Sequence, residues 1–254
     1  MWSELFLTPF LNGLLLAVLL PLLGCYLRLR DEWLAALAYA HVAAAGALLG
    51  LMLGVAPVLG GGLAAAAAGV GKQLLARRLV GGAAYPVLLL AGWSLAVLIA
   101  ANQPMAERLG HALFDGQLYF SENSQLLGGL LWTLISLLLL AWFSKRLLLS
   151  HLYPDFFRLR GLAAWPVQTG FDLVAAISLA MATMTMGVMG AFALVFVPPW
   201  LAFRRASCWQ NGLWLALLIA LFSYVTAFAL ALYCDQPFGP VLALILVIAG
   251  LFFA

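Results

Sequence analysis

Apolar runs of near-spanning length follow one another along almost the whole chain. Cutting the sequence at polar residues and at Gly/Pro clusters gives nine candidate spans, at residues 5–27, 34–54, 56–71, 84–101, 126–144, 167–186, 187–203, 209–232 and 237–254. A membrane span needs roughly 20 mostly apolar residues, so the third and seventh runs are short. The pattern predicts an all-α fold, a polytopic transmembrane helical bundle of about nine spans, with eight as the alternative.

Composition agrees with this fold class and excludes a soluble domain of the same size. Of the 254 residues, 66% are hydrophobic and 8% are charged, whereas about 25% are charged in a typical soluble domain. We therefore predict one transmembrane domain over residues 1–254. The N-terminal residues 1–4 contain no basic group ahead of the first apolar run, so we expect that run to be a retained span and not a cleaved signal peptide.

Positive charges fall on alternate loops of this nine-span arrangement. One side would hold 11 of the 12 Lys/Arg residues, and the other side Arg108 alone. The 11 are Arg28, Arg30, Lys72, Arg77, Arg78, Lys145, Arg146, Arg158, Arg160, Arg204 and Arg205. Because cytoplasmic loops are enriched in Lys and Arg, the pattern predicts an outer N-terminus and an inner C-terminus.

Two stretches interrupt the simple alternation of span and loop. Residues 102–125 form the longest outer loop, in which we expect a short interfacial or re-entrant piece. In residues 167–203, Gly187, Gly190 and the pair Pro198-Pro199 predict broken or short helices. Irregular backbone at membrane depth needs cover from protein or from a water-filled cavity, and a transport path beside this segment would provide it.

The sequence does not predict an enzyme. Residues 69–73 suggest a phosphate-binding loop, but Ala66 and Gln73 stand where that motif needs Gly and Ser/Thr. The sequence lacks a His-x-x-x-His or Cys-x-x-Cys motif and paired intramembrane carboxylates. An ion gradient or another subunit must therefore supply the energy for any transport.

Two ionisable residues lie within predicted spans, where such groups are costly and by default suggest function. His41 lies about eight residues inside the second span, and it is either a packing histidine or a metal ligand in a translocation path. Asp172 lies near the inner boundary of its span, where an interfacial or helix N-terminal carboxylate is favoured over a ligand.

Two further groups have both a chemical and a packing interpretation. Met181, Met184, Met186 and Met189 are either a soft metal-binding stripe or filling at a moving interface, which is favoured. His111, with Asp115 and Glu122, is either a cation-recruiting cluster or a solvated face, which is favoured. We include His41, Met184, Met186 and Gly187 in the predicted translocation path.

The basic interruption at residues 143–161 carries a resemblance to a known family. It runs Phe-Ser-Lys-Arg-Leu-Leu-Leu-Ser-His-Leu-Tyr-Pro-Asp-Phe-Phe-Arg-Leu-Arg-Gly and resembles the cytoplasmic segment of the zinc and manganese importer permeases of the ATP-binding-cassette class. Other pieces agree in order along nearly the whole chain: residues 113–116, the Gly-Val to Val-Pro spacing of 187–198, Arg204-Arg205, and residues 235–240.

The resemblance implies a transport subunit without its own ATP site, working by alternating access. Its partners would be two ATPases that bind ATP and magnesium, a second and identical permease copy, and an extracytoplasmic metal-binding protein, in a bacterial inner membrane. Membrane lipid would surround the chain, which would bind no cofactor and no nucleic acid. Residues 145–166 would couple to the ATPase, chiefly through Tyr153, Pro154, Asp155, Phe156, Phe157, Arg158 and Gly161, whereas the plain alternative is an ordinary basic loop.

One departure from the family pattern bears on the substrate. The family's second span carries Asp-x-Leu-x-His-Ala, and here His41 matches the histidine while Leu37 replaces the carboxylate. The resemblance implies import of a divalent metal, zinc first and then manganese or iron, with His41 as a ligand. The missing carboxylate keeps open a metal chelate or haem as substrate. A gradient-driven carrier without an ATPase is the alternative from another class.

Overall fold

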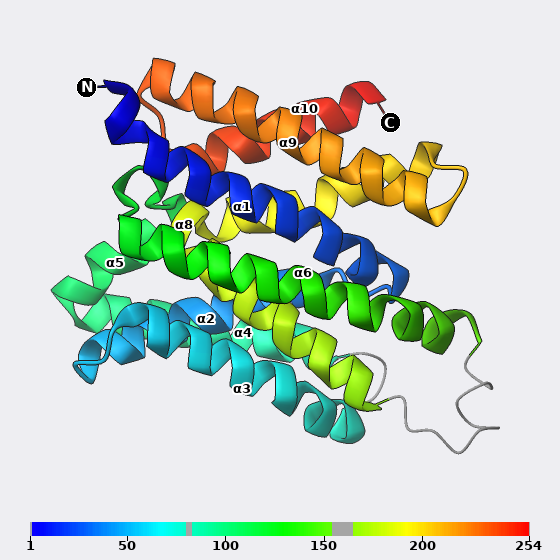
Figure 1. Ribbon diagram of the computed structural model, residues 1–254. Helices are drawn as coiled ribbons and strands as arrows, with labels where there is room; N and C mark the ends of the chain where they lie inside the picture. Colours follow the sequence, from blue (N-terminus) through cyan, green and yellow to red (C-terminus); the bar gives the residue numbers. More distant parts are fainter. Residues whose placement is uncertain (1, 80–82, 154–164, 254) are drawn as a thin grey trace.

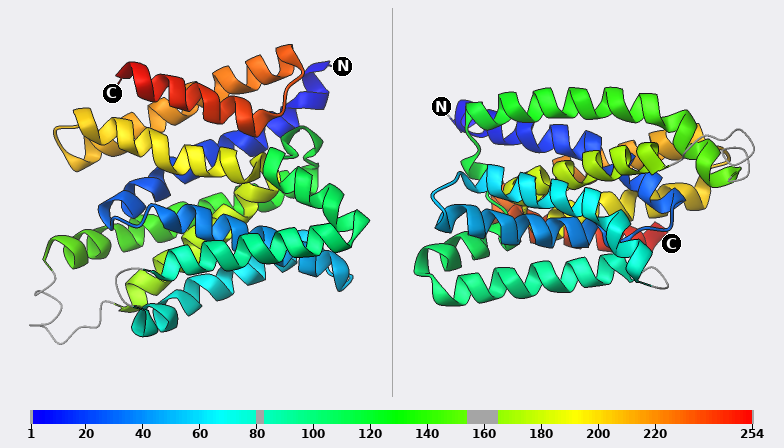
Figure 2. Two further views of the ribbon diagram at one scale, coloured as in Figure 1. Left: turned by 180° about the vertical axis from the view of Figure 1, so that it is seen from behind. Right: turned by 90° about the horizontal axis from the view of Figure 1, so that it is seen from below.

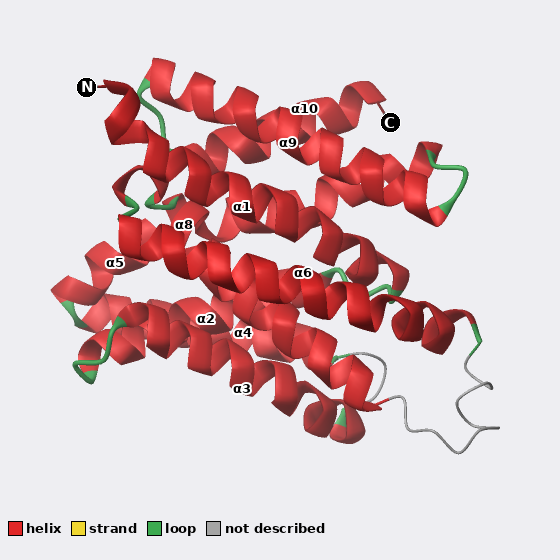
Figure 3. Cartoon of the chain, in the orientation of Figure 1, coloured by secondary structure: helices red, strands yellow, loops and turns green. Residues whose placement is uncertain are grey.

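The computed structural model describes residues 2–79, 83–153 and 165–253, and the regular structure of these residues is helical throughout (Figures 1 and 3). The elements are α1 (Trp2–Leu29), α2 (Leu34–Met52), α3 (Pro57–Arg78), α4 (Ala84–Asn102), α5 (Pro104–Asp115), the 3-10 turn η1 (Leu118–Phe120), α6 (Asn123–Leu152), α8 (Trp165–Arg205), α9 (Trp209–Cys234) and α10 (Phe238–Phe253). The predicted all-α class is confirmed.

The number of membrane crossings depends on how α8 is counted. Within the described residues, seven helices, α8 among them, are long and apolar enough to cross a membrane, and α10 is a shorter apolar helix. Gly187 interrupts α8 with φ 79° and ψ 164°, which are not helical values. The two halves of α8 meet there and diverge like the arms of a V (Figures 1 and 2). Counting both halves and α10 gives the nine predicted segments.

The break in α8 is where the sequence predicted it, at the boundary between 167–186 and 187–203. The proline pair Pro198-Pro199 behaves differently, because the second half of α8 continues through both residues to Arg205. Both prolines are buried among neighbouring helices, and packing of this kind compensates for the lost backbone hydrogen bonds.

The two chain termini lie at opposite ends of the bundle (Figures 1 and 2), as an odd number of crossings requires. The end with the C-terminus also holds residues 30–33, the start of α8 and residues 206–208. We call this the inner end and the opposite one the outer end, following the orientation predicted from the charges, which stays a prediction.

Several helices extend beyond the apolar runs that predicted them. α6 covers Asn123–Leu152, so the first part of the predicted coupling segment 145–166 continues this helix. α3 continues to Arg78 and includes Lys72. At the outer end, α5 and η1 form the short piece expected within residues 102–125.

Small residues allow α2 and α3 to cross at backbone contact. A Cβ atom added to Gly60 would lie 2.4 Å from the carbonyl oxygen of Gly46, and one added to Gly46 would lie 2.3 Å from Ala64 Cβ. Close backbone approach of this kind is the usual way in which small residues associate membrane helices. The crossing fixes α2, which carries His41, inside the bundle.

Candidate functional site

His41 is half-buried on α2 and is held by its own helix. Its Nδ1 lies 2.8 Å from the carbonyl oxygen of Leu37. Because that oxygen only accepts hydrogen bonds, Nδ1 is the donor, and Nε2 of the neutral ring keeps a lone pair for a ligand. The rings of Trp93 and Phe114 lie 6.4 and 6.0 Å from the imidazole, between centroids. The residue that replaces the family carboxylate therefore orients the imidazole through its backbone.

The predicted path residues on α8 do not share one face. Met184 is half-buried and lies against α3, because a Cβ on Gly61 would come within 2.5 Å of its Cε. Met186 is fully buried in the core, whereas Met189 is 55% exposed. Met184, Met186 and Met189 thus differ in burial, and the alternative interpretation of the methionines as a metal-binding stripe stays a prediction.

Gly187 belongs to a contact of three glycines at the outer end, which we call the glycine junction: Gly116, Gly187 and Gly239. A Cβ on Gly187 would lie 2.4 Å from the carbonyl oxygen of Phe114. A Cβ on Gly116 would lie 2.5 Å from the carbonyl carbon of Met186. Gly116 and Gly187 have φ of 88° and 79°, values that glycine adopts without penalty. The junction joins the apex of α8 to the end of α5 and the start of α10.

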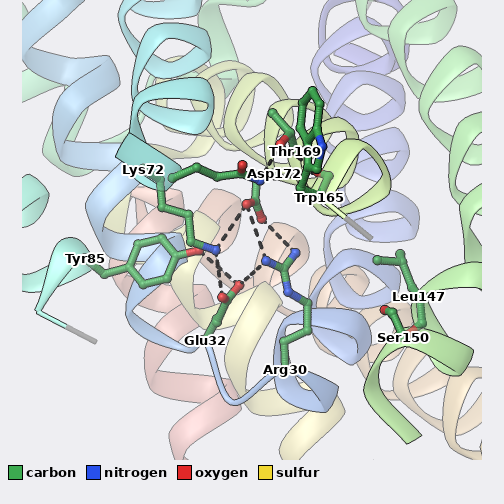
Figure 4. A network of polar contacts seen from close by, with 10 residues as sticks. Arg30, Glu32, Lys72, Tyr85, Leu147, Ser150, Trp165, Thr169 and Asp172 are labelled. Carbon is green, nitrogen blue, oxygen red and sulfur yellow. Dashed lines mark hydrogen bonds and ion pairs between the residues drawn. The ribbon is translucent and has the colours of Figure 1, made fainter. Parts of the chain in front are cut away.

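A second polar site, at the inner end, was not predicted. Arg30, Glu32, Lys72 and Asp172 form a closed ring of ion pairs, the charged ring (Figure 4). Arg30 lies 2.7 Å from Asp172 and 2.8 Å from Glu32, while Lys72 lies 2.7 Å from Glu32 and 3.1 Å from Asp172. Each charge thus meets two opposite charges, and the formal charges of the ring cancel. The hydroxyl of Tyr85 also donates to Glu32 at 3.0 Å.

The charged ring joins segments that are far apart in the sequence. Arg30 and Glu32 come from the α1–α2 connection, Lys72 from α3, and Asp172 from α8. Burial opposes the charge of the Arg30 guanidinium, but the carboxylates of Asp172 and Glu32 outweigh it and raise its pKa above the ordinary value. Arg30 therefore stays charged. A cleft of about 500 Å³ opens beside the ring, and His151 of α6 and Trp165 of α8 line it.

Asp172 is the residue whose partners sequence reasoning missed. Its side chain is fully buried and bonded to Arg30 and Lys72, and its place at the membrane interface stays a prediction. A signal was present, because a buried carboxylate needs a partner. Arg30 and Lys72 were both predicted at the same end as Asp172. Lys72 was interpreted only as one of the positive charges on the inner side, so the pairing was missed.

The predicted coupling segment can be located only at its margins. Tyr153 follows α6 and is 63% exposed, and Trp165 begins α8 and is 58% exposed. The predicted residues between them lie outside the described residues: Pro154, Asp155, Phe156, Phe157, Arg158 and Gly161. Asp172 stands two helical turns after Trp165, so the charged ring lies close to the end of this segment.

Comparison with solved structures extends the likeness to the whole fold. The chain is similar to a chain of PsaBC from Streptococcus pneumoniae in complex with Fab, with a TM-score of 0.84 and 16% identity over 99% of this chain and 95% of that one. It is also similar to an inward-facing metal-chelate type ABC transporter, with a TM-score of 0.73 and 18% identity over 96% of this chain and 84% of that one. No curated protein sequence matches significantly.

The sequence itself matches the ABC 3 transport family over residues 3–254. The match covers every described helix, from α1 to α10. The resemblance to the metal importer permeases is thereby confirmed at the level of the family. The chain belongs to the ABC 3 transport family and is a membrane-spanning permease of an ATP-binding-cassette transporter.

Proposed function

We propose that this permease imports a divalent metal ion, zinc first and then manganese or iron, across a bacterial inner membrane. The observation that carries the proposal is His41, an intramembrane imidazole whose Nδ1 is bonded to Leu37 at 2.8 Å. Neutral imidazole is a common ligand of divalent transition metals, and a hydrogen bond from the other ring nitrogen orients it for that role. Ionisable residues at membrane depth commonly mark ion pathways.

The energy for import would come from partner subunits. Two ATPases that bind ATP and magnesium would act on two permease copies, and an extracytoplasmic protein would deliver the metal. In this proposal the ATPase holds residues 145–166, in which Tyr153, Phe156 and Phe157 supply aromatic anchors and Arg158 a charge.

α8 provides a physical route from this segment to the membrane interior. Its first half begins at Trp165, contributes Asp172 to the charged ring, and ends at the glycine junction. A displacement of residues 145–166 would therefore act on the ring at the inner end and on the junction at the outer end. Coupled changes at the two ends are what alternating access requires.

A metal chelate is the second candidate substrate, and Leu37 is the observation that favours it. One imidazole without a neighbouring carboxylate binds a bare divalent ion weakly, whereas a chelate brings its own ligands. The two candidates differ in which solutes stimulate ATP hydrolysis. Free Zn²⁺ or Mn²⁺ would stimulate the metal importer, and only a metal complex or haem would stimulate the chelate importer.

The first test is affinity purification of the tagged chain in mild detergent, followed by mass spectrometry. A stoichiometric ATP-binding-cassette ATPase is expected. The doubly substituted variant Phe156→Ala/Phe157→Ala should insert normally yet lose the ATPase and the ATP-dependent uptake. Uptake equal to that of the unmodified chain would show that residues 145–166 are only a basic loop.

The second test concerns the metal path. His41→Ala should lower uptake of the true substrate at unchanged amounts of assembled transporter, because it removes the oriented imidazole. Wild-type transport kinetics in this variant would reduce His41 to a packing residue.

A further inference from the structure

A cavity of about 320 Å³ lies at the outer end between α2, α4 and α5. Most of the described residues that line it are apolar, and the ionisable ones among them are Glu107 and His111, both on α5. Both side chains are exposed, so they stand at the mouth of the cavity. Neither residue has a role in the fold described above, and together they offer a carboxylate and an imidazole to a ligand that enters the cavity.

Glu107 and His111 lie on the face of α5 that also carries Phe114, the neighbour of His41. Glu107, His111 and Phe114 have spacings of four and three residues, so they lie on one helix face. Phe114 also lines the cavity, and its ring centroid is 6.0 Å from that of His41. The face begins with the two polar groups and ends with an aromatic ring against the imidazole.

α2, which carries His41, forms the wall of the cavity opposite α5. Ala44 and Leu48 line the cavity from α2, and they follow His41 by three and seven residues, on the same helix face. His41 therefore lies on the face of α2 that lines the cavity, next to Phe114.

We propose that Glu107 and His111 form a capture site for a divalent metal cation, from which the ion passes Phe114 to reach His41. This inference rests on the proposed function and deepens it. One carboxylate oxygen and one imidazole nitrogen suit zinc, manganese and iron, and water completes the coordination. Glu107 supplies the negative charge that the path lacks at Leu37. The site retains a cation before it meets the imidazole of His41.

The structure also changes the partner that the sequence assigned to His111. Asp115 and Glu122 do not line the cavity. Glu122 instead caps the start of α6, in a capping box with Gln125. Glu107 lies one helical turn before His111 and lines the same cavity. It replaces Asp115 and Glu122 as the carboxylate that we assign to His111.

The test is equilibrium binding of Zn²⁺ and Mn²⁺ to the purified complex of permease and ATPase, without the extracytoplasmic protein. Glu107→Gln and His111→Ala should each raise the Kd for Zn²⁺ by at least about tenfold, because loss of even an outer-sphere partner of a metal ligand costs that much. The control Asp115→Asn makes the same charge change at the same end and should bind as the wild type does. Both target side chains are exposed, so the variants should fold normally.

A rescue variant separates ligation from general packing. His111→Cys should keep tight Zn²⁺ binding, because a thiolate is a good zinc ligand, and should lose Mn²⁺ binding, since manganese prefers oxygen. Zn²⁺ binding that is the same in Glu107→Gln, His111→Ala and the wild type would overturn the capture site.

Metal uptake into vesicles, measured on the full transporter, keeps the two proposals distinct. If the wild type imports metal and the variants bind Zn²⁺ unchanged, the capture site fails and the importer stands. If the wild type imports no metal, yet Glu107→Gln and His111→Ala weaken Zn²⁺ binding, the capture site stands and the importer fails.

Discussion

The two ends of the bundle are closed by different kinds of contact. At the inner end, four charged side chains from three separate segments form the charged ring, with every ion pair between 2.7 and 3.1 Å. At the outer end, the glycine junction brings backbone against backbone, with no room for a Cβ on Gly187. One closure depends on electrostatics and the other on shape.

This difference bears on how each end can move. When an end opens, water can replace the ion-pair partner of each charged side chain, so the residues of the charged ring have an alternative set of partners. The glycine junction depends instead on close steric contact of the backbone, which any substitution with a Cβ would disturb. The inner end is therefore suited to open and close by exchange of its ion pairs, whereas a movement at the outer end must carry α5, α8 and α10 together. The substitutions below test that contrast.

The largest effect is expected from Asp172→Ala. This change leaves Arg30 and Lys72 buried without one of their two partners, and breaking a buried ion pair typically costs about 3–5 kcal/mol. Chemical unfolding in detergent would measure the loss of free energy. The exposed-charge control Asp115→Asn should change stability by less than about 0.5 kcal/mol. Equal stability of the two variants would show that the ring does not hold the inner end.

A smaller loss is expected from Gly187→Ala. Its φ of 79° and ψ of 164° fall in a region open almost solely to glycine, so the strain should cost about 1–3 kcal/mol. The matched control is Gly62→Ala on α3, where an added Cβ meets nothing within 4 Å. That control should be neutral or stabilising by about 0.5–1 kcal/mol, because alanine favours a helix. If both variants lose the same stability, the junction is not a steric closure.

The smallest effect is expected from Tyr85→Phe, which removes one hydrogen bond to Glu32 and leaves all four ion pairs. Glu32 is 21% exposed in its side chain, so water can replace the hydroxyl, and the loss should be about 1 kcal/mol. A loss as large as that of Asp172→Ala would mean that the hydroxyl, and not the ion pairs, governs the inner end.

The sequence was sufficient for the fold because each crossing carries its own signal. Apolar runs mark the spans, and Gly187 marks the break in α8, where local conformation decides the structure. Helix ends were less predictable. α3 and α6 extend past their apolar runs through Lys72 and Lys145, since a helix can continue into water on polar residues that carry no hydropathy signal.

The candidate sites were harder to predict because their residues meet only in three dimensions. Asp172 and Arg30 are 142 residues apart in the chain, and no local spacing relates them. Glu107 and His111 are close in sequence, yet only the packing of α5 over α2 and α4 shows that they face the same cavity as Phe114. His41 was found from sequence because one ionisable residue in an apolar run is conspicuous by itself.

The length of α6 has a consequence for how the transporter is assembled. The apolar run of this helix ends near Ser144, and residues 145–152 extend the helix by about 12 Å at 1.5 Å per residue. Such an extension places Tyr153 beyond the end of the apolar run, on a continuous helix. In the proposed assembly, the helix would set the distance between the apolar run and an ATPase bound at Tyr153, and shortening α6 by one turn would both shift and rotate this docking point.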